Sequence, residues 1–408
     1  MKQFREITAV PNLNDTSVRL SLNTRLPQFI GAPSDADNRL AALKIAVIGC
    51  GSVGRNIALH LARLQITEVR LVDKGVLKLE SLLTHMCQPE EVFQRQPKAS
   101  NLGLLLKGIN PATTVLVFDG AIEALDLHAL VDIDVVVLAT DNLLAEVKTA
   151  QKCLWLGIPL IQASVHGDTL LAQVRFFANG NAHGPCPVCS YSKEEWNALN
   201  RETRFSCEGN SQASTPRIDG APTMSTSFLC AMASDLAMVQ VVRHALGLGM
   251  PVEDTMVEYC GFNHRTVVSP LKPNPGCPCD HTAYRRVLSP HSLPECTLRQ
   301  LTDTSGLGGG SDFAAMSFKV GNLAFCNLWF CRCTKSRIAE RFINPAEVGE
   351  TCPVCEELIR PQPFHTHYPV PASAIDNVLG RRLRDLGAAS VDWVVVYGSQ
   401  GGVLLYHN

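Results

Sequence analysis

Residues whose types and spacing could bind a nucleotide lie near the start of the chain. A G-x-G-x-x-G turn follows the β-branched run 44–48, and Asp73 ends the next strand-like run, 68–72. The residues of this turn that could contact a nucleotide are Gly49, Gly51, Ser52 and Gly54. Glycines allow a tight turn and let phosphates approach backbone N–H groups at a helix start, and Asp73 has the spacing of a ribose-binding carboxylate. We therefore expect a nucleotide site here.

Three further polar residues could act on the phosphates. Asp141 and Asn142 follow the strand-like run 134–139, and the carboxyl ends of parallel strands are where open α/β sheets bind ligands. An acid there could hold Mg²⁺ against nucleotide phosphates. Lys98, at a predicted helix start, could reach the same phosphates as a point charge. The alternatives are a helix cap for Asp141 and a solvated amine for Lys98.

Close cysteine pairs indicate metal sites. The chain has 16 cysteines, and pairs of this spacing favour zinc over a disulfide framework. Eight cysteines lie in such pairs: Cys186, Cys189, Cys277, Cys279, Cys331, Cys333, Cys352 and Cys355. We expect two structural zinc sites, the first four residues forming one and the last four the other. The alternative is one site that uses both C-x-x-C pairs, and His365 and His367 are more simply surface residues.

Composition limits the classes of function. The net charge of −2 and the pI near 6.6 argue against a nucleic-acid partner. No apolar run is predicted to span a bilayer, because the best candidate, 228–242, is interrupted by polar residues. Residues 1–10 lack the apolar segment of a signal peptide. We expect a cytoplasmic protein with no membrane partner and with reduced thiols.

The elements that must position these residues alternate in type. Between residues 44 and 163, strand-like runs alternate with helix-period segments, and a strand at 170–177 is expected to be antiparallel. This order predicts an α/β fold with a Rossmann-like, mainly parallel sheet and helices on both faces. A long apolar helix is predicted at 223–248, after a turn-rich region.

Many segments together resemble the ThiF/MoeB/HesA-type superfamily of ubiquitin-activating (adenylating) enzymes. Between residues 19 and 281 they follow the family's order: IGCGSVG, LVDKG, QRQPKA, GINP, VVVLATDN, GIPLIQASV, GPCPVC, FSCEG and NPGCPC. The resemblance implies ATP, Mg²⁺ and Zn²⁺ as cofactors. It places Asp73 at the ribose, Lys98 at the phosphates and Asp141 at the magnesium ion, and Arg55 would also face the phosphates.

Cys207 is the best candidate for a catalytic thiol. It lies in FSCEG ahead of the long helix, and the family places its thioester- or persulfide-forming cysteine in a comparable loop. Nearby Arg204 could favour the reactive thiolate. The alternative is an inert loop cysteine, and Cys230 is a poorer candidate because it sits on the apolar helix.

One crossover departs from the family. The family has a second acid two residues after the ribose aspartate and then an N-L-x-R-[QH] segment. Here Gly75 replaces the acid and SLLTH stands at 81–85, so that only His85 fits. The missing arginine normally supports the ATP phosphates. Three arginines could replace it, the first two from the N-terminal arm of this chain or of a partner subunit: Arg19, Arg25 and Arg95.

The resemblance implies activation of a ubiquitin-like protein at its C-terminal glycine, a thioester on Cys207 and transfer to a conjugating enzyme, in a homodimer. The alternatives are a sulfur-carrier adenylyltransferase for thiamine, molybdopterin or tRNA thiolation, a degenerate non-catalytic scaffold, and an NAD-dependent oxidoreductase, against which the cysteine pairs argue. We expect an arm at 1–40, an adenylation domain with the cysteine loop and a zinc knuckle at 41–282, and a small C-terminal α+β docking module with a second zinc site at 283–408. Within the last we expect a helix at 379–386 and a hairpin around Gly401.

Overall fold

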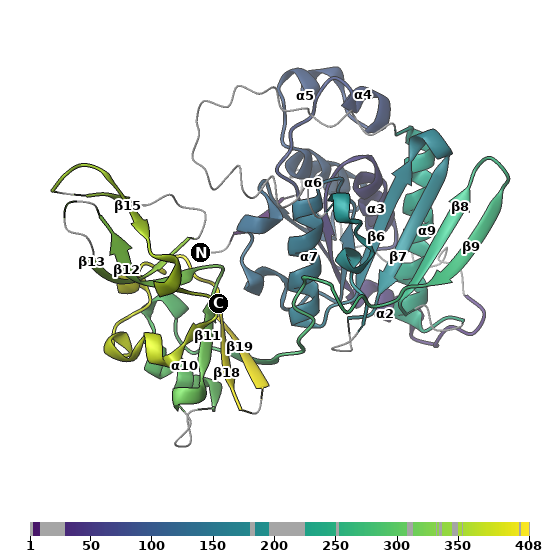
Figure 1. Cartoon of the computed structure of the whole chain (residues 1–408). Helices are drawn as coiled ribbons and strands as arrows, with labels where there is room; N and C mark the ends of the chain where they lie inside the picture. Colours follow the sequence, from purple (N-terminus) through teal and green to yellow (C-terminus); the bar gives the residue numbers. More distant parts are fainter. Residues whose placement is uncertain are drawn as a thin grey trace. The chain divides into compact units, whose positions relative to one another are not determined.

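The protein forms two units (Figure 1). The computed structural model describes these residues: 3–8, 29–179, 184–195, 225–249, 253–307, 313–331, 333, 337–344, 350–352, 354–399 and 401–407. The first unit contains the described residues up to 191 and 225–283, and the second contains 192–195 and those from 284 onward. The predicted three-part division of the chain stays a prediction.

A nine-stranded sheet forms the centre of the first unit, in the order β1-β4-β3-β2-β5-β6-β7-β8-β9. Its strands are β1 (Arg5–Glu6), β2 (Lys44–Ile48), β3 (Glu68–Val72), β4 (Thr114–Phe118), β5 (Val135–Leu138), β6 (Leu160–His166), β7 (Leu171–Phe177), β8 (Thr255–Cys260) and β9 (Arg265–Pro270). The five from β4 to β6 run parallel, whereas β1, β7, β8 and β9 are antiparallel to their neighbours. The predicted α/β fold is confirmed.

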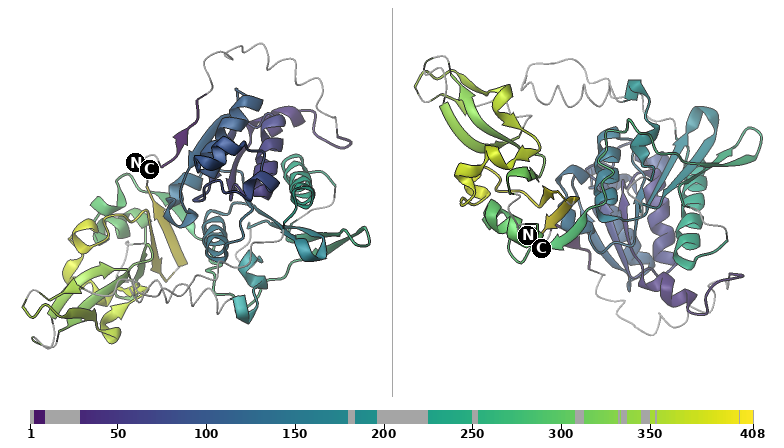
Figure 2. Two further views of the ribbon diagram at one scale, coloured as in Figure 1. Left: turned by 90° about the horizontal axis from the view of Figure 1, so that it is seen from above. Right: turned by 60° about the horizontal axis from the view of Figure 1, so that its bottom comes forward.

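Helices cover the sheet because its central strands are apolar on both faces. Ile45 and Val47 of β2 pack into the core with the helices α3, α6 and α9, while Ala46 and Ile48 point to the opposite face and are equally buried. Figures 1 and 2 show α3 and α9 side by side. The helices of this unit are α2 (Ala36–Ala42), α3 (Ser52–Arg63), α4 (Ser81–Thr84), α5 (Pro89–Phe93), α6 (Lys98–Ile109), α7 (Leu143–Leu156) and α9 (Ser227–Leu246).

Helix α9 differs from one expectation from the sequence. Residues 228–242 are predicted to be too polar to span a bilayer, whereas α9 is long and apolar enough to do so by length and composition alone. Half of the apolar 18-residue stretch of this helix is buried inside the protein, as in a core helix. Ala233 and Ala237, both fully buried, allow α9 to approach α3 closely, and the Ser234 hydroxyl donates to the Val53 carbonyl oxygen at 2.8 Å.

The second unit has a larger and a smaller sheet. The larger, in the order β10-β19-β18-β11-β17, packs with helix α10 (Leu298–Ser305) around a continuous apolar core. Its strands are β10 (Arg285–Leu288), β11 (Ser317–Val320), β17 (Val370–Pro371), β18 (Trp393–Gly398) and β19 (Gly401–Tyr406). The smaller sheet contains β12 (Ala324–Phe330), β13 (Arg337–Ile343), β14 (Glu350–Thr351), β15 (Leu358–Pro361) and β16 (Thr366–His367).

Of two local predictions in this unit, the helix is wrong and the hairpin is confirmed. Within the segment expected to be a helix, only Arg384–Leu386 forms a 3₁₀ turn. Leu383 and Leu386, three residues apart, are both fully buried, and this spacing suits the 3₁₀ repeat better than a longer α-helix. The predicted terminal hairpin is confirmed by the antiparallel pairing of β18 with β19; Gly401 pairs with Gly398 and so begins β19.

Candidate nucleotide site and metal centres

The glycine turn lies at the carboxyl end of β2. Gly49 has φ +94°, and a Cβ there would lie 2.5 Å from the Ala139 carbonyl oxygen, while a Cβ on Gly54 would lie 1.9 Å from the Gly49 carbonyl oxygen. Both positions therefore require glycine for close packing. Gly51 differs, since a Cβ on it would meet no described atom within 4 Å. The open space beside Gly51 and the helix start at Ser52 fits a phosphate group.

Asp73 and Lys98 meet beside this turn. The Asp73 Oδ2 accepts from the Cys50 N–H and its Oδ1 from the Gly75 N–H, both at 2.6 Å. The Lys98 N–H donates to the Gly75 carbonyl oxygen at 2.9 Å. A Cβ on Gly75 would lie 3.0 Å from Asp73 Oδ1 and 3.5 Å from Lys98 Cδ, so both side chains flank this glycine. A carboxylate and an ammonium group are thus brought to one edge of the sheet.

Asp141 lies at the end of the adjacent strand, β5. The helix cap proposed as its alternative role belongs instead to Asn142, whose Oδ1 accepts from the Ala145 N–H at 2.9 Å. Asp141 is exposed to solvent, and β5 pairs directly with β2. The carboxylate that could hold Mg²⁺ is therefore on the same edge as the turn, while cofactor contacts of Asn142 stay a prediction.

Arg55 is buried inside the unit, with 2% of its surface exposed. Its Nη2 donates to the Met86 carbonyl oxygen at 2.7 Å and to Asn101 Oδ1 at 2.8 Å. Asn101 in turn donates to Glu91 Oε1 at 2.7 Å. Burial lowers the pKa of Arg55. These bonds tie the crossover after α4 to α3 and α6, and contact of Arg55 with phosphates stays a prediction.

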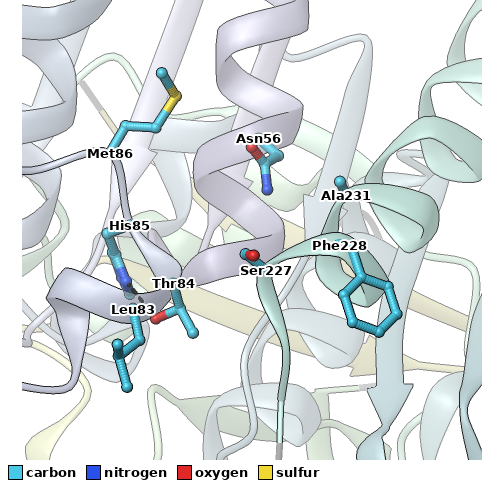
Figure 3. A pocket seen from close by; sticks show the side chains of 8 residues that line it. All are labelled: Asn56, Leu83, Thr84, His85, Met86, Ser227, Phe228 and Ala231. Atoms are coloured by element: carbon cyan, nitrogen blue, oxygen red, sulfur yellow. Dashed lines mark hydrogen bonds between the residues drawn. The ribbon is translucent and has the colours of Figure 1, made fainter.

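A pocket of about 340 Å³ opens between the crossover and the starts of α3 and α9 (Figure 3). Its lining residues are Asn56, Leu83, Thr84, His85, Met86, Ser227, Phe228 and Ala231. The Nδ1 of His85 is bonded to the Thr84 hydroxyl at 3.0 Å, and its buried Nε2 has no hydrogen-bond partner among the described residues. Burial, followed by the charges of Lys98 and Arg55, lowers the pKa of His85 to about 4. The ring is therefore neutral at physiological pH.

The predicted catalytic thiol, Cys207, lies outside the described residues, as do Arg19 and Arg25. Two described thiols near the turn are poor nucleophiles. Cys50 is fully buried and Cys230 is 1% exposed, and burial raises the pKa of each. The assignment of Cys207 stays a prediction.

The predicted zinc cysteines gather in two groups. In the first, four donor atoms lie within 4.8 Å of one another, from Cys186, Cys189, Cys277 and His281. The Sγ of Cys186 is 3.7 Å from that of Cys277 and 3.8 Å from that of Cys189, and the Cys189 Sγ is 3.7 Å from His281 Nε2. A tetrahedral zinc ion with Zn–S distances of about 2.3 Å has ligand–ligand distances of about 3.8 Å. These donors fit zinc.

His281 is the ligand candidate that sequence reasoning missed. Cys279, predicted in its place, is buried beside Cys186 and Cys277 but is outside the set of four mutually close donors. The C-x-C-x-H spacing of 277–281 could have shown it, because His281 is a possible zinc ligand only four residues after Cys277. The second group consists of Cys331, Cys333, Cys352 and Cys355, and lies in the second unit.

The neutral, buried state of His85 predicts a pH-dependent stability. The unfolded chain protonates this histidine below about pH 6.5, whereas the folded protein does so only near pH 4. Stability should therefore fall as the pH drops through this window, by up to about 3 kcal/mol. In His85→Gln the fall should be smaller.

Denaturant unfolding at pH 7 and pH 4.5 measures the effect. Since acid also protonates zinc-binding thiolates, the comparison is with His365→Gln, an exposed histidine of the second unit. Equal pH dependence in both variants would show that His85 is not buried in its neutral form.

The first metal centre predicts unequal roles for two neighbouring residues. His281→Ala should lower the zinc content of the purified chain by one ion, because it removes one of four mutually close donors. Cys279→Ala should leave the zinc content unchanged. Elemental analysis by mass spectrometry gives zinc per chain, and the opposite order of effects would assign the fourth position to Cys279.

Known proteins resemble this chain over part of its length. SAMP-activating enzyme E1 from Haloferax volcanii is 26% identical over 133 residues, which are 32% of this chain and 49% of that protein. Mouse adenylyltransferase and sulfurtransferase MOCS3 is 26% identical over 228 residues, 55% of this chain and 44% of that protein. The chain thus spans less than half the length of these curated relatives.

A solved structure shares the fold. MccB from E. coli, crystallised with MccA, covers 66% of this chain and 76% of its own, with 18% identity and a TM-score of 0.50. The family model that describes ThiF proteins matches residues 22–279, which include the glycine turn, Asp73, Lys98, Asp141 and the first cysteine group without His281. The chain belongs to the ThiF family.

Proposed function

We propose that this protein is an ATP-dependent adenylyltransferase that activates the C-terminal glycine of a ubiquitin-like or sulfur-carrier protein. The observation that carries this proposal is the meeting of the glycine turn, Asp73, Lys98 and Asp141 at one sheet edge in a ThiF-family chain. Turn, acid and amine suit the phosphates, ribose and metal of one nucleotide.

Each group has a separate task in this proposal. Backbone N–H groups at the start of α3 and the Lys98 ammonium offset the negative charge of the triphosphate. Asp73 accepts hydrogen bonds from the ribose hydroxyls. Asp141 holds Mg²⁺, which supplies further positive charge at the phosphates. The glycine carboxylate of the partner then attacks the α-phosphorus, a mixed anhydride forms and pyrophosphate leaves.

In a second step, the Cys207 thiolate attacks the acyl carbon of the adenylate, and AMP leaves as the thioester forms. The acyl group then passes to a conjugating enzyme. Sulfur-carrier activation is the second candidate, favoured by the similarity to MOCS3, an adenylyltransferase and sulfurtransferase, whereas the similarity to SAMP-activating enzyme E1 favours an E1-type activating enzyme. We also propose that the protein is a homodimer and is cytoplasmic. The alternative to catalysis is a scaffold that binds the partner protein without activating it.

ATP–pyrophosphate exchange tests the first step. With a ubiquitin-like or sulfur-carrier partner present, the wild-type chain should exchange labelled pyrophosphate into ATP. Asp141→Ala should lower the rate by at least about 100-fold, because the metal loses its anchoring carboxylate. The matched control is Asp168→Ala, an exposed acid in the turn between β6 and β7, which should exchange normally. Wild-type rates in Asp141→Ala would remove this residue from the mechanism.

Cys207→Ala tests the second step separately. The variant should keep pyrophosphate exchange, since adenylation precedes capture, and should lose a covalent partner adduct that thiols cleave. Gel electrophoresis without reducing agent detects the adduct, and Cys260→Ala, a half-buried cysteine on β8, is the control. An adduct that survives in Cys207→Ala would place the nucleophile elsewhere, and absence of exchange in the wild type would favour the scaffold.

A further inference from the structure

We propose that the cysteines of the second unit bind one zinc ion, and that this ion attaches the β14–β15 hairpin to strand β12. The ThiF family match ends at residue 279, so this centre lies outside the part of the chain that the family describes. It also lies in the unit that does not contain the nucleotide site. The inference is therefore independent of the proposed adenylation.

The four sulfur atoms are arranged as donors to one ion. All lie within 4.8 Å of one another. The Sγ of Cys331 is 3.1 Å from that of Cys333 and 3.4 Å from that of Cys355, and the Cys333 Sγ is 3.7 Å from that of Cys352. These distances exceed the disulfide bond length of about 2.05 Å and approach the edge of a zinc tetrathiolate, about 3.8 Å.

Backbone N–H groups point at two of these sulfur atoms. The Val354 N–H donates to Cys352 Sγ at 3.5 Å, and the Cys355 N–H also bonds this sulfur. The Glu357 N–H bonds Cys355 Sγ. Hydrogen bonds of this kind stabilise a negatively charged sulfur more than a neutral thiol, and a metal-bound cysteine is a thiolate. The turn is therefore built for metal-bound cysteines.

Two features of the described residues join the hairpin to β12: β15 pairs with β12 at two residue pairs, and a small group of buried residues lies beneath. On β12, Phe325 belongs to the large core of the unit, whereas Ala324 and Cys326 face the opposite side. The buried residues on that side are Ala324, Cys326, Trp329, Cys331, Ile343 and Cys352. Among the side chains that the structure describes, the hairpin contributes Cys352 to this group, with Cys355 packed against it, and small folded segments with little apolar burial usually need a metal or disulfides.

Binding is a ligand exchange without oxidation. Zn²⁺ displaces the protons of the four thiols, which pass to solvent, and its water ligands leave as four Zn–S bonds form. Four thiolates leave no open position on the ion, so the centre is structural and not catalytic. Cys331 directly follows β12, whereas Cys352 and Cys355 lie in the loop between β14 and β15. One ion bound by all of them therefore joins β12 to the hairpin.

Zinc content of the full-length protein tests the site. Cys352→Ser and Cys333→Ser should each lower the zinc content by one ion per chain, whereas Cys326→Ala, which removes a buried sulfur of the same sheet, should not. Cys333 is exposed, so its replacement should least disturb packing. Cys333→His should retain the ion, because imidazole is also a zinc ligand.

Hydrogen exchange of the same variants tests the attachment. Amides of β15 should exchange at least about tenfold faster in Cys333→Ser than in the wild type, while those of β18 and β19 should not change. Unchanged zinc content in both serine variants would overturn the site. A thiol titration of the denatured wild type that finds two thiols fewer than the variant Cys333→Ser predicts would also overturn it, because it would indicate a Cys331–Cys333 disulfide. Loss of zinc with full protection of β15 would overturn the attachment.

Discussion

The parallel pairing of β2 with β3 and β5 is the constraint on which the candidate nucleotide site depends. Ile48 is in register with Val72 on one side and Leu138 on the other, so the three strands end at the same edge. The glycine turn, Asp73 and Asp141 follow these ends and meet although they are far apart in sequence. Burial on both faces fixes this register, because a one-residue slip along the strand would place the polar residues that flank it in the core.

Sequence patterns predicted what local chemistry and periodicity determine. The strands β2 and β3 have the predicted bounds because β-branched runs lie between turn residues. What the sequence did not reveal depends on tertiary contacts. Arg55 is buried and bonded to Met86 and Asn101, which no spacing indicates, and the closeness of His281 to three cysteine sulfur atoms appears only in the folded chain.

The two cysteine centres stabilise the protein in different ways. The first joins the segment after β7 to the segment after β9 inside a unit with a large apolar core, so it adds a cross-link to a fold that is already well packed. The second lies over six buried residues, two of which are its own ligands. We therefore expect metal binding and folding to be coupled more tightly there, where few described residues are buried and β15 pairs with β12 at two residue pairs.

The crossover between β3 and α6 sets how phosphate charge must be balanced. Thr84 stands where the family's arginine is expected, His85 is neutral, and the buried Arg55 guanidinium donates from Nη2 to Met86 and Asn101. Lys98 is then the cation that both flanks Gly75 and lies beside the turn. A triphosphate carries more negative charge than one ammonium group can offset, so helix-end N–H groups, Mg²⁺ on Asp141 or an arginine from outside the described residues must supply the remainder.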